Sequence, residues 1–187
     1  MAVYNTGSDA ANTMIRAFLT KVGELYLGHT FSTHSGKGKE IWTRIKTERF
    51  NEQCAYCNEV SETLTIEHLV MFNRDQCGLH HPGNIVPCCK KCNRRGYNPE
   101  EKRTFTWQEQ LEQVCEDQGV SIQEFSRRKR RILESIKGEA YPDLTDDEIN
   151  ALRAVARSLY DRVSSELGRA IDLFQDIDSS LVQRRGE

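Results

Sequence analysis

Two pairs of cysteines have the spacing of a metal-binding site. Two residues separate Cys54 from Cys57, and two separate Cys89 from Cys92. Such a gap lets both sulfurs of a pair face one ion across a tight turn, and two pairs complete a tetrahedral thiolate site. Because four soft ligands leave no coordination position open, the spacing predicts a structural Zn²⁺ and not a catalytic one.

Other cysteines leave alternatives open. Cys88 competes with Cys89, but three residues would then separate it from Cys92, so that Cys89 fits better. Cys77 and Cys115 are predicted to be spare thiols. Buried free thiols, or an iron–sulfur cluster, would also account for four clustered cysteines. Nothing else in the sequence indicates redox chemistry, and zinc is therefore the preferred interpretation.

Between the two pairs lie residues that could hydrolyse a phosphodiester. This reaction needs an activated water, neutralisation of the phosphate charge and stabilisation of the leaving oxygen. A neutral histidine is the best base near pH 7, and a divalent cation with oxygen ligands supplies the other two effects. Glu67 and His68 are adjacent in a β-like run. Because neighbouring strand side chains diverge, one could hold the metal while the other reaches the water.

The order of these residues resembles the HNH endonucleases, or ββα-metal nucleases, in their zinc-bound form. The resemblance covers residues 52–97, about a quarter of the chain. It rests on an acid–histidine pair ending a strand, an asparagine before a short apolar strand, and a cysteine pair followed by asparagine: Glu67-His68, Asn84 and Cys89-x-x-Cys92-Asn93. It implies a small zinc-clamped ββα-metal module. Together with the N-terminal and C-terminal helices that apolar periodicity predicts on either side, this gives an α+β, mostly helical fold.

This resemblance implies a role for each residue of the motif. His68 would be the general base, and Glu67 and Asn93 would bind a catalytic Mg²⁺ or Mn²⁺. Asn84 would brace the loop and backbone that position His68. The structural Zn²⁺ would clamp the module through its four ligands, Cys54, Cys57, Cys89 and Cys92.

The resemblance also implies the secondary structure of the module. Strands around 64–70 and 84–88 would form a hairpin, and residues 89–97 would form the helix that seats the metal. A module of fewer than about 50 residues has little core, so the zinc is expected to matter for folding.

The sequence departs from the usual motif at a few positions. Glu67 stands where Asp is more usual, and Asn93 where many members have His. His80 and His81 lie in the intervening segment, where they either place an extra imidazole near the site or belong to a polar loop.

The net charge of −2 hides an uneven distribution. Residues 90–103 carry six bases and two acids, residues 127–137 six bases and one acid, and residues 139–178 ten acids and four bases. A basic middle can neutralise phosphates, which predicts DNA as the partner. A solvated helix face is the alternative for the 127–131 run. The bases predicted to contact the DNA backbone are Lys90, Lys91, Arg94 and Arg95.

Apolar residues at the helical period predict the flanking elements. They indicate helices over 9–27 and 39–49, and two capping boxes open helices at 107–118 and 122–138. A third capping box, at Thr145, opens a helix with a long apolar stripe. This helix either breaks near Gly168 or forms a coiled-coil-like arm. The predicted domains are 1–49 (helical), 50–98 (the HNH module) and 99–187 (helical).

The sequence therefore predicts a metal-dependent endonuclease that hydrolyses DNA phosphodiester bonds. The alternative is a non-catalytic, zinc-clamped DNA-binding module. A nucleobase deaminase fits poorly, because it needs an open zinc site with a His-x-Glu sequence near its cysteines. Here the order is Glu67-His68, and four cysteines close the zinc.

Cellular location and assembly are predicted from what the sequence contains. No apolar run approaches the roughly 20 residues that span a bilayer, and no signal peptide is recognisable. Clustered thiols without a secretion signal indicate an intracellular, cytoplasmic protein of bacterial or phage type. The C-terminal stripe favours either packing within the chain or a homodimer through the C-terminal helices.

Overall fold

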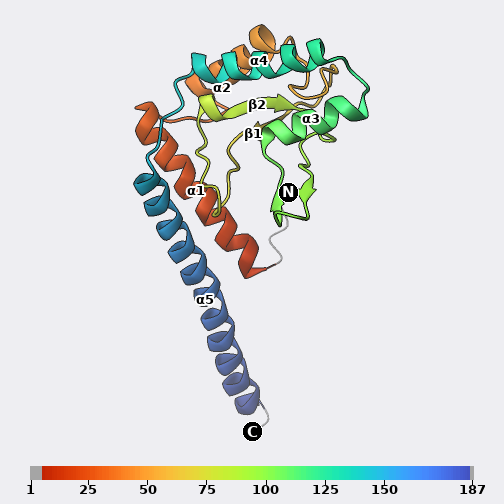
Figure 1. Cartoon of the computed structure of the whole chain (residues 1–187). Coiled ribbons are helices and arrows are strands. Elements are labelled where there is room, and N and C mark those ends of the chain that lie inside the picture. Colours follow the sequence, from red (N-terminus) through yellow and green to blue (C-terminus); the bar gives the residue numbers. More distant parts are fainter. Residues whose placement is uncertain (1–5, 186–187) are drawn as a thin grey trace. The chain divides into compact units, whose positions relative to one another are not determined.

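The computed structural model of the protein describes residues 6–185, with side chains as far as residue 181. The fold is α+β and 58% helical, with two small antiparallel sheets (Figure 1). No helix in the described part of the chain is long and apolar enough to cross a membrane.

Contacts divide the chain into two compact units. The first takes in the described parts of residues 1–18, 73–77 and 144–187, and the second takes in residues 19–72 and 78–143. The predicted domain boundaries near residues 49 and 98 both fall inside the second unit.

A pair of strands lies in the second unit. Strand β1 (Thr65–His68) pairs antiparallel with β2 (Ile85–Cys88), so that Glu67 lies opposite Val86. Both occupy the predicted positions, although each is shorter than expected. All four residues of β2 are buried, because the strand is covered by helices and loops. Side chains alternate along β1, so that Glu67 and His68 leave the strand on opposite faces.

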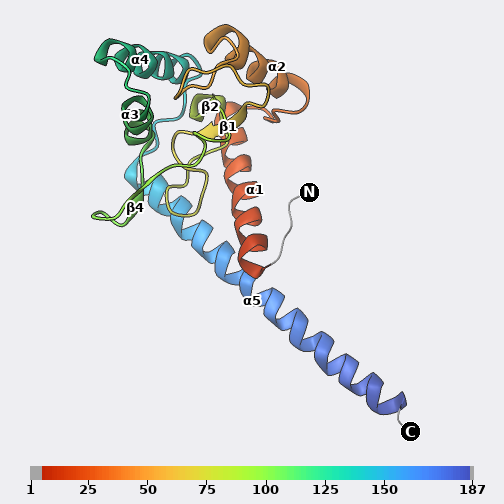
Figure 2. The same cartoon turned by 90° about the vertical axis from the view of Figure 1, so that its right-hand side faces the viewer.

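Helices surround this strand pair. Helix α2 (Gly36–Arg44) continues as a π-helical turn (Ile45–Arg49), and α3 (Trp107–Asp117) and α4 (Ile122–Gly138) follow later in the chain. Figures 1 and 2 show α2 and α4 on the same side of β1 and β2. Fully buried side chains of the core between them include Phe50, Tyr56, Ile85, Leu111 and Ile132.

The predicted capping residues begin the later helices. The Thr106 hydroxyl accepts from the Glu109 amide, and the Glu109 carboxylate accepts from the Thr106 amide, which completes a capping box at the start of α3. The Ser121 hydroxyl accepts from the Glu124 amide at the start of α4. Both predicted helices are confirmed to within one residue.

The helix predicted over residues 89–97 is wrong. The Asn93 amide donates to the Cys89 carbonyl over 3.0 Å, which closes one turn only. The chain then enters β3 (Tyr97–Asn98), which pairs with β4 (Arg103–Thr104). Two local causes end the turn. Gly96 is a poor helix residue and lies tightly against the Phe105 ring, and Pro99 restricts Asn98 to an extended conformation.

Two long helices contribute to the first unit. Helix α1 (Gly7–Leu27) begins there, and α5 (Asp146–Arg185) runs for 40 residues without a break at Gly168. Ser8 Oγ lies 3.0 Å from the Tyr160 hydroxyl, and Gly7 lies against Leu167. In both views α5 continues past the start of α1 (Figure 2). The arm predicted as one of two alternatives is therefore present.

Candidate metal centre and active site

The four predicted zinc ligands converge. Their Sγ atoms all lie within 4.8 Å of one another, and the Sγ atoms of Cys57 and Cys89 are 3.9 Å apart. A tetrahedron with Zn–S bonds of roughly 2.3 Å has sulfur–sulfur edges of about 3.8 Å. The donor set and its spacing therefore fit a structural Zn²⁺. This ion would be held by Cys54, Cys57, Cys89 and Cys92.

Crowding of the thiols favours a bound cation. The pKa of the Cys54 thiol lies far below its usual range, because its sulfur is in contact with the thiols of Cys57, Cys88 and Cys92. The same contact with Cys54 raises the pKa of Cys57 to about 12. A cation at the centre would let all the ligands ionise together. Cys88 lies 3.8 Å from the sulfur of Cys54 but outside the group of four.

Backbone contacts shape the first cysteine turn. The Asn58 amide donates to the Cys54 carbonyl over 2.9 Å, and the Ala55 amide donates to the Pro87 carbonyl of β2 over 2.8 Å. Asn58 has a φ of 63°, a left-handed conformation that Asn tolerates better than most residues. The turn is therefore fixed to the strand that leads to the second cysteine pair.

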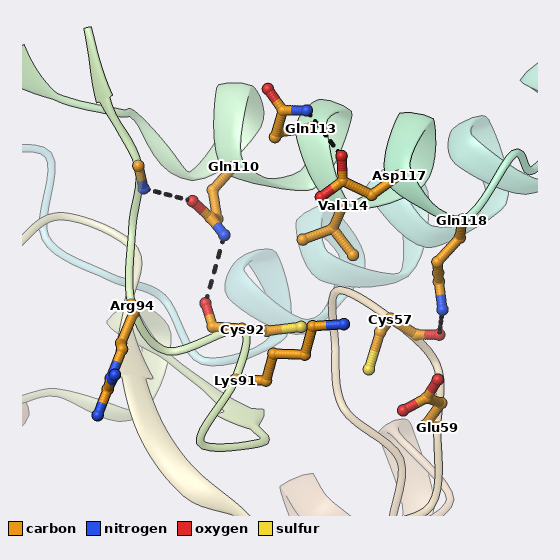
Figure 3. Close-up of a pocket in the computed structure, with 11 residues that line it drawn as sticks. Cys57, Glu59, Lys91, Cys92, Arg94, Gln110, Gln113, Val114, Asp117 and Gln118 are labelled. Atoms are coloured by element: carbon orange, nitrogen blue, oxygen red, sulfur yellow. Dashed lines mark hydrogen bonds between the residues drawn. The ribbon is translucent and has the colours of Figure 1, made fainter.

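Helix α3 and the residue after it brace one ligand of each pair. Gln110 Nε2 donates to the Cys92 carbonyl over 3.5 Å, and Gln118 Nε2 donates to the Cys57 carbonyl over 3.3 Å. Figure 3 shows both glutamines beside a pocket of about 290 Å³ that Cys57 and Cys92 also line. The polar side chains here support the metal centre from outside.

Part of the 127–131 basic run supports the same turn. The Arg128 side chain is 6% exposed, and it donates to Glu124, to the Tyr56 carbonyl and to Gln118 over 2.7–2.8 Å. Arg131 donates to the Asn58 side chain over 2.6 Å. These two arginines tie α4 to the cysteine turn, so the run is neither a uniform DNA surface nor a uniform solvated face.

We expect Arg128→Met to lower the free energy of unfolding by about 2–4 kcal/mol, because the buried Tyr56 carbonyl and the Gln118 and Glu124 side chains lose a charged donor. The matched control is Arg130→Met on the same helix, since Arg130 is 72% exposed and makes only a long ion pair, 3.9 Å, with Glu134. That change should cost less than about 1 kcal/mol. Chemical denaturation measures both variants, and equal effects would contradict the bracing role of Arg128.

The motif residues meet at a second cleft. Glu67, His68 and Asn93 all line a cavity of about 280 Å³, together with Phe72 and Arg95. Both strand residues line it although their side chains diverge, and so does Ile66, the residue before them. An acidic residue, a histidine and an asparagine therefore line one cavity.

His68 is held by aromatic neighbours. Its ring stacks on Phe72 with 4.6 Å between centroids, and its Nε2 lies 3.0 Å from Nδ1 of His80. Burial lowers the pKa of His80, which favours its neutral form. His81 lies elsewhere, with its Nδ1 accepting from the Gly83 amide, and burial lowers its pKa to about 4. The sequence left the positions of these two histidines undecided. In the structure His80 lies at the site, and His81 caps a turn.

Asn84 connects two segments that flank the site. Its Oδ1 accepts from the Val70 amide over 2.7 Å, and its Nδ2 donates to the carbonyls of Val70 and Leu79 over 2.9 Å each. The side chain is 1% exposed. Val70 lies two residues after His68, and Leu79 lies directly before His80, so Asn84 fixes the backbone on both sides of the imidazole pair.

Glu67 is neutralised by a partner that the sequence did not predict. Its Oε1 accepts from Arg95 Nε over 2.6 Å and from the Tyr56 hydroxyl over 3.2 Å. Burial raises the pKa of the Glu67 carboxyl, and the charge of Arg95 opposes that shift. The Arg95 side chain is 3% exposed and also donates to the His68 carbonyl. The buried Arg95 side chain therefore does not fit the prediction that Arg95 contacts the DNA backbone. The other three bases of that prediction are exposed: Lys90, Lys91 and Arg94.

A divalent cation fits this cleft in part. The Asn93 Nδ2 donates to Thr65 and to the Ile66 carbonyl, so the amide is oriented by β1. A carboxylate and an amide in one cleft are donors that Mg²⁺ prefers. However, a cation on Glu67 would share that carboxylate with Arg95. Within residues 6–181, the four cysteines are the one group of three or more His, Cys, Asp or Glu side chains close enough to share an ion.

Comparisons of the chain with models of protein families, with curated proteins and with solved structures find no match. The roles of the site residues therefore depend on the geometry and on the resemblance of the motif. Sequence reasoning missed Tyr56 and Arg95 as partners of Glu67, and it left the contact between His80 and His68 open. No local sequence pattern predicts these contacts, because each joins residues more than ten positions apart in the sequence.

Proposed function

We propose that the protein is a metal-dependent endonuclease of the HNH type that hydrolyses DNA phosphodiester bonds. The convergence of Glu67, His68 and Asn93 on one cleft carries the proposal. These three residues come from β1 and from the turn after the second cysteine pair, so the zinc centre would set their spacing. A structural zinc thus supports a separate catalytic cleft.

In this proposal His68 removes a proton from the attacking water. The neutral imidazole is suited to that step near neutral pH, and stacking on Phe72 limits its rotation. Glu67 and Asn93 would hold the divalent cation, which when bound supplies charge neutralisation at the phosphate and the leaving oxygen. Lys90, Lys91 and Arg94, exposed on the turn beside Asn93, would contact the DNA backbone. The resemblance implies 5′-phosphate and 3′-hydroxyl ends.

A plasmid-nicking assay tests the proposal. Purified protein is incubated with supercoiled plasmid with and without added Mg²⁺ or Mn²⁺, in buffer freed of trace metal. Omission of the metal is preferable to a chelator, because a chelator would also remove the zinc. Cleavage that depends on the added metal is the expected result. Binding without cleavage under every metal condition would overturn the proposal.

A second candidate function is a non-catalytic, zinc-clamped DNA-binding module. The ion pair between Glu67 and Arg95 favours it, because a buried guanidinium already neutralises the carboxylate that the catalytic cation would use. The same nicking assay, run beside a DNA-binding measurement by fluorescence anisotropy, separates the two candidates.

We also propose a homodimer through α5. Beyond the start of α1, this helix exposes Ile171, Leu173, Phe174, Ile177 and Leu181, and Phe174 is 66% exposed. From Leu167 to Leu181, large apolar residues follow one another at spacings of four, three, three and four, which keeps them on one face of the helix for pairing with another helix. The five residues beyond the start of α1 are each 46–66% exposed, so the stripe offers apolar area toward the roughly 800 Å² per partner that a stable interface buries. A second copy presents the same stripe, and it would also supply a second active site.

We expect Phe174→Arg to weaken the dimer by at least about 100-fold, because it places a charge in the centre of the apolar stripe. Gln175→Arg adds the same charge to the adjacent, polar position and should leave the dimer intact. Sedimentation velocity at micromolar concentrations measures both variants. A wild-type monomer, or a dimer that survives Phe174→Arg, would contradict this assembly.

A further inference from the structure

We infer that His80 is a positioning residue, which holds the ring of His68 in the orientation and tautomer that a general base requires. This inference rests on the proposed function, since it assigns His80 a part in the same reaction. The contact that carries it joins Nε2 of His68 and Nδ1 of His80, 3.0 Å apart.

The contact has two possible arrangements. In a hydrogen bond between neutral imidazoles, one nitrogen donates and the other accepts. If His80 donates, Nε2 of His68 uses its lone pair in the contact, and Nδ1 carries the proton. If His68 donates from Nε2, its Nδ1 carries the lone pair and can take a proton from water. In the second arrangement alone, the basic nitrogen of neutral His68 is not the one that contacts His80.

The second arrangement also suits His68 after it has taken a proton from the water. When His68 has taken a proton, both of its ring nitrogens carry hydrogen, so Nε2 must donate. Nδ1 of His80 can accept that hydrogen bond only with its own proton on Nε2. The bond then becomes charge-assisted, and such bonds are roughly twice as strong as neutral ones. His80 would thus stabilise the state that forms as the water is deprotonated.

His80 is itself firmly held. Its ring packs at 5.0 Å from Phe31 and 5.7 Å from Phe72, measured between centroids. Its backbone lies so close to α1 that a Cβ at Gly23 would be 2.6 Å from the His80 carbonyl oxygen. Only glycine permits this approach without a shift. The preceding residue, Leu79, donates to the Tyr141 hydroxyl and accepts from Asn84. A rigid acceptor therefore faces His68.

The arrangement gives Asn84 an indirect part in orienting the base. Its amide contacts the backbone of Val70 and Leu79, whereas the imidazole of His68 meets that of His80. Asn84 would fix the segment that carries His80, and His80 would fix the ring.

Two substitutions of His80 separate the role of its acceptor from that of its bulk. His80→Phe keeps an aromatic ring but has no acceptor. His80→Asn places its Oδ1 near the position of Nδ1 and can still accept. We expect His80→Phe to lower kcat for plasmid cleavage by roughly 10–100-fold, by analogy with partners that orient a histidine ligand, with little change in KM. His80→Asn should keep kcat within a few-fold. His34→Phe, at an exposed histidine, is the control.

A second readout does not depend on cleavage. The chain has five histidines, and ¹⁵N-histidine labelling resolves the tautomer of each ring by NMR. His68 should carry its proton on Nε2 in the wild type and in His80→Asn, and it should populate both tautomers in His80→Phe. All variants are first matched for zinc content and stability.

The outcomes distinguish this inference from the proposed function. If His80→Phe leaves kcat and the His68 tautomer unchanged, or if both substitutions at position 80 reduce kcat equally, the inference fails and the proposed function stands. If the wild type binds DNA but never cleaves it, the proposed function fails, and the catalytic part of the inference fails with it.

Discussion

Replacement of one candidate zinc ligand, Cys54→Ser, is expected to abolish zinc binding and unfold the second unit. A structural zinc in small domains contributes roughly 10–16 kcal/mol of binding free energy, whereas whole domains are stable by only about 5–15 kcal/mol. Cys54 is fully buried, and its turn contacts both β2 and α4 through neighbouring residues. Loss of the ion would leave thiols crowded in the core without a common partner.

Elemental analysis and thermal unfolding measure this effect. The wild type should contain one zinc per chain, and Cys54→Ser should contain little and unfold at a much lower temperature. Cys115→Ser is the matched control, because Cys115 is a buried thiol of the same unit outside the cluster. A Cys54→Ser variant with full zinc content and wild-type stability would contradict the assignment of the four cysteines as a structural zinc site.

The second large effect is expected at His68, the proposed general base. His68→Ala should lower the rate of plasmid cleavage by roughly 10²–10⁴-fold, the usual contribution of a general base. DNA affinity should change little, because the substitution leaves the exposed basic side chains of Lys90, Lys91 and Arg94 in place. Single-turnover cleavage and anisotropy measure the two quantities separately.

The control for this variant is His34→Ala, which removes an exposed imidazole from the same unit. Zinc content should match the wild type in both proteins, since neither side chain belongs to the cluster. Near-normal cleavage by His68→Ala would exclude His68 as the base and would favour the non-catalytic DNA-binding module if the wild type were also inactive.

Features that are determined by residues close together in the sequence could be predicted. Two-residue spacing identified the four cysteines that converge, and capping boxes placed α3 and α4 within one residue. The helix predicted over 89–97 does not form because Gly96 and Pro99 are two local signals against a helix, which the motif does not override.

The partners of the site residues had no such local cause. Arg95 belongs to a basic run, and nothing in that run tells Arg95, which enters the core, from Arg94, which stays exposed. Burial of Arg95 depends on Glu67 and on the carbonyls that β1 presents. The same holds for Arg128 on α4, whose acceptors belong to the cysteine turn. Such contacts follow from tertiary packing and require the structure.

The two units are interleaved along the chain, and this limits where it can be divided. Residues 73–77 belong to the first unit, while their neighbours on both sides belong to the second. Asp75 accepts from Arg153 of α5, and Arg74 packs over the ring of Tyr160. A chain shortened at residue 143 would thus keep a five-residue segment without its partners, between the strand that carries His68 and the segment that carries His80. The roles of residues on either side of this segment are therefore better tested by single substitutions than by truncation.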